Sequence, residues 1–202
     1  MPRVAGQIDA AKTEAILEAA GEVLTERGLS APIGEIARRA GVAKQTIYNR
    51  YGCKAALVRA MIERRVELIA APLLAPGAAE RPEEALADFG RSVLKAITQD
   101  RGAAVIRVSV QGAAELPDVA LSVFEAGPRG SRRRLADYLR QEAAAGRLAI
   151  DDPGQAAEFF AGMVIGSHQL AVLFGVKTAL DDEKIDRIAR EAARRFVKAY
   201  AP

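Results

Sequence analysis

Cysteine, histidine and tryptophan are nearly absent from this chain of 202 residues, which has one cysteine, one histidine and no tryptophan. The single Cys53 excludes an internal disulfide and a zinc site built from several cysteines, and we expect no metal and no cofactor. Alternating β-branched residues are also scarce, whereas alanine is frequent, which favours helices over strands. The sequence therefore predicts an all-α protein.

The chain has no large excess of charge of one sign, since 29 basic and 26 acidic residues leave a formal net charge of +3. The basic excess lies at the start of the chain. Residues 1–65 hold 11 basic and 7 acidic side chains, whereas residues 66–202 hold 18 and 19. A polyanion would be attracted to the first third of the chain, although a solvated basic surface would give the same excess.

No segment is typical of a signal peptide or of a membrane span. Residues 1–6 lack an apolar leader core, and the longest uncharged stretch, residues 159–176, contains three glycines and the polar run Ser167-His168-Gln169. We expect a cytoplasmic protein with no membrane partner. The short motifs of nucleotide-binding proteins, zinc proteases and serine hydrolases are absent from the sequence, so we expect no enzyme.

Helical periodicity and helix-breaking residues divide the chain into two predicted domains, 9–71 and 72–202. The segment 73–81 is the predicted linker. A strand stays open as an alternative for the β-branched residues 104–110. The predicted helices cover residues 9–27, 33–40, 43–50, 54–71, 82–99, 103–113, 117–145 with a break at Gly127-Pro128, 153–174 and 182–200.

A short helix, a glycine turn and a second short helix follow one another within residues 33–51. Gly41 supplies the positive φ that a tight turn between two helices requires. The small Ala37 lets the second helix approach closely, and Val42 and Ile47 supply apolar contacts between the pair. This order of residues predicts a helix-turn-helix.

That packing leaves a polar face at the start of the second helix, where base edges of DNA are contacted in helix-turn-helix proteins. A glutamine amide bonds adenine at two atoms, and a lysine reaches guanine or a phosphate. A solvated, merely basic helix face is the alternative. The residues predicted to contact bases are Lys44, Gln45, Thr46 and Asn49, and those suited to phosphate oxygens are Tyr48, Arg50, Tyr51 and Lys54.

These residues carry a resemblance to a known family. The N-terminal domain resembles the DNA-binding domain of the TetR (tetracycline-repressor-type) transcriptional regulators, and the remainder resembles the AefR-type C-terminal domain. The segments that carry the first resemblance are residues 16–20 (ILEAA), 28–29 (GL), 36–42 (IARRAGV), 47–51 (IYNRY) and 54–57 (KAAL).

The resemblance implies a bacterial, ligand-responsive transcriptional regulator, acting as a repressor released from a palindromic double-stranded DNA operator by a small, largely apolar effector. It further implies a homodimer formed through the last two helices, and a C-terminal bundle for ligand binding and dimerisation. A helical adaptor or ligand-binding protein without DNA binding is the alternative. Neither the operator, the effector nor the regulated genes can be identified from the sequence.

Three positions depart from the family pattern. Ala31-Pro32 stands where the family commonly has a hydroxyl residue that caps the second helix, and Ala43 replaces a frequent serine cap of the recognition helix. Cys53 stands where an aspartate or serine is common. A redox-sensing thiol and a tolerated small residue are both open interpretations of Cys53.

Apolar residues spread over the middle helices are the candidates for the effector pocket, and a filled core is the alternative for each of them. The predicted lining residues are Phe89, Val93, Ile106, Val110, Phe124, Tyr138, Phe160 and Met163. The basic run of Arg129 and residues 132–134 is expected to form a solvated helix start or an ion-pair site between subunits, with no role in DNA binding.

Overall fold

A computed structural model describes residues 5–176 and 180–202. The prediction that residues 1–6 form no leader falls partly outside the described residues. Every regular element within these ranges is a helix, which confirms the all-α class. Residues 104–110, for which a strand stayed open, are helical. Among the described helices, none is both long enough and apolar enough for a bilayer span.

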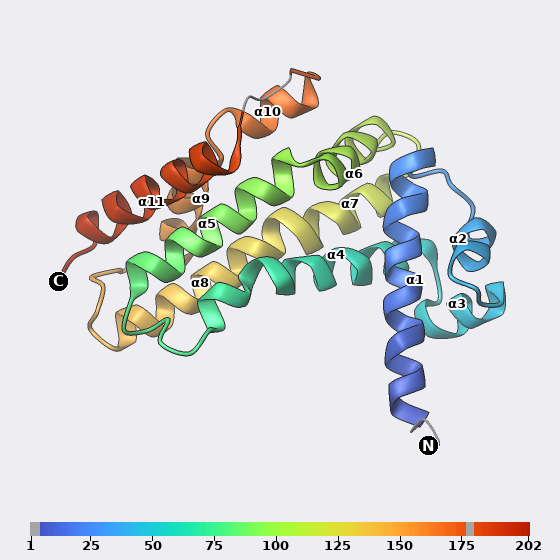
Figure 1. Cartoon of the computed structure of the whole chain (residues 1–202), viewed down its shortest axis with the longest axis horizontal. Helices are drawn as coiled ribbons and strands as arrows, with labels where there is room; N and C mark the ends of the chain where they lie inside the picture. The colour runs from blue at the N-terminus through green and yellow to red at the C-terminus, as the bar shows by residue number, and fades with distance from the viewer. Residues whose placement is uncertain (1–4, 177–179) are drawn as a thin grey trace. The chain divides into compact units, whose positions relative to one another are not determined.

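Figure 1 shows the order of the helices along the chain. The first group is α1 (Ala5–Arg27), α2 (Ile33–Arg39), α3 (Lys44–Tyr51), α4 (Lys54–Ala70) and the 3-10 turn η1 (Ala71–Leu74). The second group is α5 (Pro82–Thr98), α6 (Asp100–Gln111), α7 (Pro117–Phe124) and the π turn η2 (Glu125–Arg129). The last group is α8 (Gly130–Ala144), α9 (Pro153–Ile165), α10 (His168–Leu173) and α11 (Asp182–Ala199).

The chain forms two compact units that do not follow the order of the sequence. Unit 1 comprises Met1–Arg64 and Ala104–Gly127, and unit 2 comprises Arg65–Ala103 and Pro128–Pro202. The boundaries fall inside α4 and α6, so each of these helices contributes residues to both units. A segment from the middle of the sequence is therefore part of the unit that contains the first three helices.

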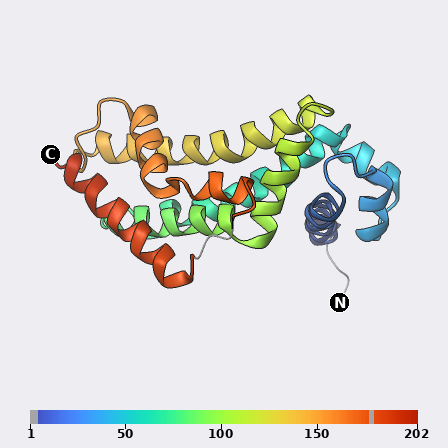
Figure 2. The same ribbon diagram turned by 90° about the horizontal axis from the view of Figure 1, so that it is seen from above.

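Unit 1 is built on the apolar face of α1, where Ile16, Ala20 and Leu24 recur at helical spacing and are almost completely buried. Figures 1 and 2 show α2 packed against α1 and α3 packed against α2. The segment 104–127 packs closely against Leu29 at Gly112, where an added Cβ would lie 3.2 Å from the Leu29 side chain. A side chain at position 112 would therefore push these segments apart.

Unit 2 has α5 and α11 lying antiparallel, as ion pairs along their length indicate. Lys95 pairs with Asp182 at 2.8 Å, and one turn further along Arg91 pairs with Asp186. The core beneath contains a row of rings in which Phe160 contacts Phe196 edge to face, with 5.2 Å between the ring centroids. Ring pairs of this geometry add stabilisation beyond their buried area.

The predicted helix over residues 153–174 is wrong as a single element. It breaks at Gly166, which has a φ of 48°, a conformation that few residues other than glycine adopt. The two pieces, α9 and α10, therefore follow different directions. Helix 117–145 is interrupted near Gly127-Pro128 as predicted, and the interruption is a single π turn that contains Pro128.

The segment 73–81, predicted as a linker, is packed into unit 2. Leu73 and Ala78 are buried, and the buried Tyr138 hydroxyl donates a hydrogen bond to the Ala78 carbonyl at 2.9 Å. Proline and glycine in this segment therefore shape a packed connection, and they do not mark a flexible spacer.

Truncation of a buried leucine in α5 provides a test of this core. Leu94 is 0% exposed, and Leu94→Ala is expected to lower the free energy of unfolding by about 2–5 kcal/mol, because it removes buried methyl groups and leaves a cavity. Leu74→Ala is the matched control, since Leu74 is 73% exposed and its loss should change stability by less than about 0.5 kcal/mol. Urea unfolding measures both, and equal effects would contradict the packing described.

Candidate nucleic-acid interface

The turn between α2 and α3 has the hydrogen bonds of a helix-ending glycine motif. Gly41 has a φ of 66°, its N–H donates to the Arg38 carbonyl at 3.3 Å, and the Val42 N–H donates to the Ala37 carbonyl at 3.0 Å. These two bonds satisfy carbonyls at the end of α2 and turn the chain sharply. Ala37 is buried and Val42 half-buried, as their predicted structural roles require.

The geometry of this turn decides which face of α3 is inside. Ile47 is 1% exposed and packs within unit 1, whereas Lys44, Gln45, Tyr48 and Asn49 are exposed. These four belong to the set predicted to contact DNA. Thr46, also in that set, is half-buried.

Two pairs of side chains one helical turn apart organise the exposed face of α3. The Gln45 Nε2 donates to the Asn49 Oδ1 at 2.7 Å, and the Lys44 ammonium lies 5.5 Å from the centre of the Tyr48 ring. The second distance is within the range of a cation–π interaction. The face therefore presents ordered polar groups before any partner binds.

The first turn of α3 is not capped by a side chain. Ala43 occupies the N-cap position with extended backbone (φ −69°, ψ 144°) and makes no side-chain hydrogen bond to the helix. Free N–H groups at a helix start carry partial positive charge and attract anions. A phosphate oxygen would satisfy them, and Lys44 adds a full positive charge at the same end.

Two of the residues predicted to contact phosphates, Arg50 and Lys54, make hydrogen bonds within unit 1. Arg50 donates to the Thr13 hydroxyl, and the Lys54 ammonium donates to the Leu29 carbonyl and, at 2.5 Å, to the Ala31 carbonyl. Burial lowers the pKa of Lys54. Lys54, at the start of α4, thus bonds the loop that precedes α2 through its carbonyls.

Tyr51 lies at the end of α3 with its hydroxyl buried. Among the described residues this hydroxyl has no hydrogen-bond partner, and burial raises its pKa. A hydroxyl in this position is not directed at an outside phosphate. Cys53, between α3 and α4, is exposed.

An ion-pair cluster holds α2 against α1 and was missed by the sequence analysis. The Arg39 guanidinium pairs with Glu26 at 2.8 Å and with Glu22 at 3.2 Å. The hydrogen bonds that Arg39 donates to Glu26 and Glu22 raise the pKa of Arg39, and the bond to Glu26 lowers the pKa of that carboxylate. The spacing of the two glutamates on one face of α1 was the available signal, but it does not identify their partner on another helix.

The predicted effector residues separate into a packed core and exposed positions. Phe89, Tyr138 and Phe160 are buried, and the Phe89 and Phe160 ring centroids lie 6.3 Å apart. Val93 and Ile106 are half-buried. The exposed members are Val110, Phe124 and Met163.

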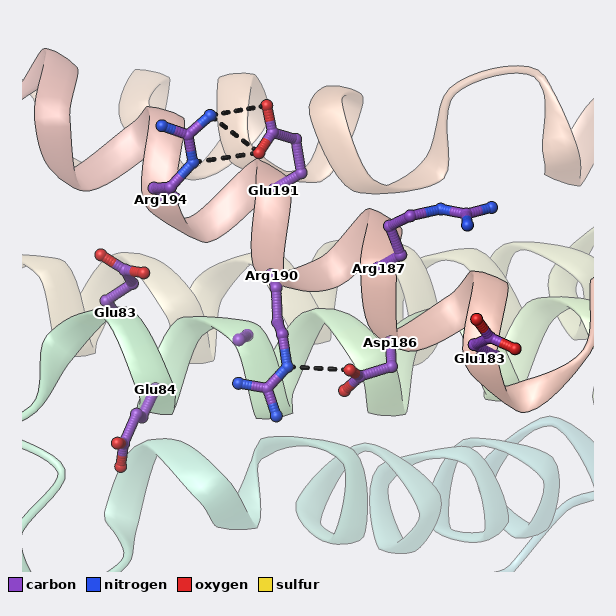
Figure 3. Close-up of a pocket in the computed structure, with 9 residues that line it drawn as sticks. Glu83, Glu84, Glu183, Asp186, Arg187, Arg190, Glu191 and Arg194 are labelled. Carbon is purple, nitrogen blue, oxygen red and sulfur yellow. Dashed lines mark hydrogen bonds and ion pairs between the residues drawn. The ribbon is translucent and has the colours of Figure 1, made fainter.

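Two pockets of unit 2 lie along α11. The first, of about 700 Å³, is lined by acidic and arginine side chains of α5 and α11, among which Arg190 pairs with Asp186 (Figure 3). A lining of this charge does not suit an apolar ligand. The second, of about 470 Å³, is lined by Met163 of α9 and by both apolar and charged side chains of α11, namely Arg187, Ile188, Glu191, Ala192 and Arg195.

No arrangement of three or more histidine, cysteine, aspartate or glutamate side chains suited to a metal ion occurs among the residues that were described. Within the arginine run at the start of α8, Arg132 donates to the Pro128 carbonyl at 3.0 Å and pairs with Glu158 at 2.7 Å.

Two family models match the chain. Residues 16–61 match the model described as bacterial regulatory proteins of the tetR family, and residues 84–202 match the AefR-like transcriptional repressor C-terminal domain. No curated protein sequence is significantly similar to the chain.

Solved structures of transcriptional regulators are similar to this chain over most of its length. The flavonoid-responsive regulator FrrA is 32% identical, with 95% of this chain and 97% of that chain covered and a TM-score of 0.70. A TetR-family regulator from Mesorhizobium loti MAFF303099 (20% identity, coverage 96% and 98%, TM-score 0.77) has a similar fold. So does a TetR regulator from Agrobacterium tumefaciens (22% identity, coverage 94% of each chain, TM-score 0.71).

Substitution of the turn glycine tests whether this geometry positions α3. Gly41→Val places a β-branched side chain at positive φ, which is expected to lower the free energy of unfolding by about 1–2 kcal/mol or more and to abolish duplex binding while unit 2 stays folded. Gly34→Val in α2 is the control, because no atom lies within 4 Å of an added Cβ there and φ is not positive. Urea unfolding and duplex titration measure both variants, and unchanged binding by Gly41→Val would contradict the role of the turn.

Proposed function

Because the chain belongs to the TetR family of bacterial transcriptional regulators, we propose that it represses transcription as a homodimer that binds a palindromic operator and leaves it when a small, largely apolar effector binds. Residues 9–71 serve as the DNA-binding domain in this proposal, and residues 72–202 serve for ligand binding and dimerisation.

One observation carries the DNA-binding part of the proposal. The Gly41 turn buries Ile47 and leaves Lys44, Gln45, Tyr48 and Asn49 exposed on α3. These side chains offer hydrogen-bond donors and acceptors to base edges, and the uncapped helix start offers N–H groups to a phosphate. Thr46 lies at the margin of this contact. Arg50, Tyr51 and Lys54 act indirectly, since their polar groups are engaged or buried within unit 1.

Exposed apolar residues on α9 support dimerisation through the last helices. Phe159 is 55% exposed and Met163 is 41% exposed, and both lie on α9. Met163 adjoins α11 at the half-buried Ile188 and the buried Ala192. Exposed apolar side chains grouped on one helix favour burial by a partner surface. The same two helices of a second copy would cover them around a two-fold axis.

A planar aromatic molecule is the class of effector that we propose to test first. The 32% identical regulator FrrA is named as flavonoid-responsive. An apolar pocket with few polar anchors is typical for such ligands. Within unit 2, Val93 is neither part of the filled core nor exposed, and is our candidate effector contact there.

Effector and operator oppose each other through the spacing of the two copies of α3. Successive major grooves on one face of DNA are roughly 34–36 Å apart, so a dimer binds tightly only when its recognition helices have this separation or a whole-turn multiple of it. An effector that favours a different separation shifts the population away from the DNA-binding form. Reciprocity requires that DNA weaken effector binding by the same factor.

Selection of duplexes from a random pool tests the proposal as a whole. We expect the wild-type protein to enrich a palindrome, with an affinity that falls steeply as salt is raised, because phosphate contacts release counterions. A panel of flavonoids added to the selected duplex is then expected to weaken binding, as read by fluorescence anisotropy. A protein that binds no duplex at low salt would instead be a helical adaptor or a ligand-binding protein.

A single charge in the exposed apolar face tests the dimer. Phe159→Glu places a carboxylate on the exposed apolar face of α9, where desolvation in an interface is costly, and is expected to halve the molar mass measured by light scattering at micromolar concentration. Leu74→Glu is the matched control, since Leu74 is exposed on η1 and belongs to neither helix of the proposed interface. Dimers of Phe159→Glu, or monomers of the wild type, would contradict this interface.

A further inference from the structure

The two amide side chains on the exposed face of α3 are not independent of each other. The Gln45 Nε2 donates to the Asn49 Oδ1 at 2.7 Å, across one turn of helix. An amide has one oxygen that accepts and one nitrogen with two hydrogens that donate. The bond therefore fixes which atoms of the Gln45 amide remain available to an outside partner.

Gln45 retains one N–H and its carbonyl oxygen. A base edge that matches this pair must offer one acceptor and one donor side by side. Adenine does so in the major groove, with N7 as acceptor and the N6 amino group as donor. Guanine offers two acceptors there, and thymine and cytosine offer one hydrogen-bonding group each, so each of these leaves an atom of Gln45 without a partner.

Asn49 accepts this hydrogen bond with one of the two lone pairs of its Oδ1. Its second lone pair and both hydrogens on Nδ2 stay available, so the bond does not restrict Asn49 itself to one base. What Asn49 supplies is the acceptor that holds the Gln45 amide with its carbonyl oxygen and its second N–H free.

We propose, on the basis of the DNA-binding function proposed above, that the Gln45–Asn49 hydrogen bond sets the base preference of Gln45, which selects adenine. Asn49 is the positioning residue in this arrangement, because it orients the amide that reads the base.

This coupling makes predictions that separate contacts do not. When Asn49 is removed, Gln45 keeps its own side chain but loses the partner that fixes its amide, so adenine is selected less strongly. An aspartate at position 49 still accepts the Gln45 hydrogen bond, so it should keep the adenine preference.

The experiment compares the duplexes selected from a random pool by the wild type and by Gln45→Ala, Asn49→Ala and Asn49→Asp. We expect the wild-type half-site to contain an adenine that is preferred roughly ten- to a hundredfold over the other bases. Gln45→Ala should lose this adenine preference. Asn49→Ala should reduce it by roughly three- to tenfold, the effect of leaving one side chain to be ordered on binding. Asn49→Asp should restore it, because its carboxylate accepts the same hydrogen bond.

The control is Gln141→Ala, which removes an exposed glutamine from α8 in unit 2 and should leave the selected sequence unchanged. Full adenine preference in Asn49→Ala would overturn the coupling, and so would a wild-type site without an adenine sensitive to Gln45→Ala. In both cases a selected palindrome would leave the proposed DNA binding intact. A wild type that selects no duplex would overturn both proposals together.

Discussion

The backbone turn at Gly41 fixes the rotation of α3 about its own axis, and the chemistry of the exposed face depends on that rotation. The Gly41 and Val42 amides bond carbonyls at the end of α2, which leaves little freedom in where α3 begins. Consecutive residues of a helix differ by about 100° in direction. Displacement by one residue would expose Ile47 and turn polar side chains toward the Ala37 surface, so packing and recognition are specified by the same few bonds.

The cations of unit 1 have two different roles, and net charge does not separate them. Arg39 and Lys54 satisfy carboxylates and backbone carbonyls inside the unit, which holds α2 in place. Lys44 lies outside, at the uncapped start of α3, where it strengthens the attraction of the helix end for anions. The basic excess of the first third of the sequence is thus partly structural.

Local pattern predicted the helix-turn-helix segment and carried the resemblance to the family. The positive φ of Gly41, the buried Ile47 and the exposed Gln45 and Asn49 were predicted from residue type and spacing, and the TetR and AefR-like resemblances are confirmed by the family models. The break at Gly166 was not predicted. Three glycines interrupt residues 159–176, and only Gly166 ends a helix within residues 153–174, because the packing of the two pieces decides which glycine adopts the unusual backbone.

The roles of apolar residues were predicted least well, since hydrophobicity does not distinguish a filled core from an exposed face. Phe160 and Phe159 are neighbours of the same type, yet the first is buried against Phe196 and the second is exposed. The Gln45–Asn49 bond illustrates a related point, since the i,i+4 spacing permits it but the side-chain conformations decide whether it forms.

The sequence by itself determined that the chain is helical, where the recognition helix lies and which of its faces is polar, because periodicity and glycine placement act over a few neighbouring residues. Only the tertiary structure decided which charges pair across helices and that Ala104–Gly127 completes unit 1. The physical reason is the separation along the sequence of the residues that determine each feature. A helix face is encoded within about two turns, whereas the partner of that face depends on how distant segments fill the same space.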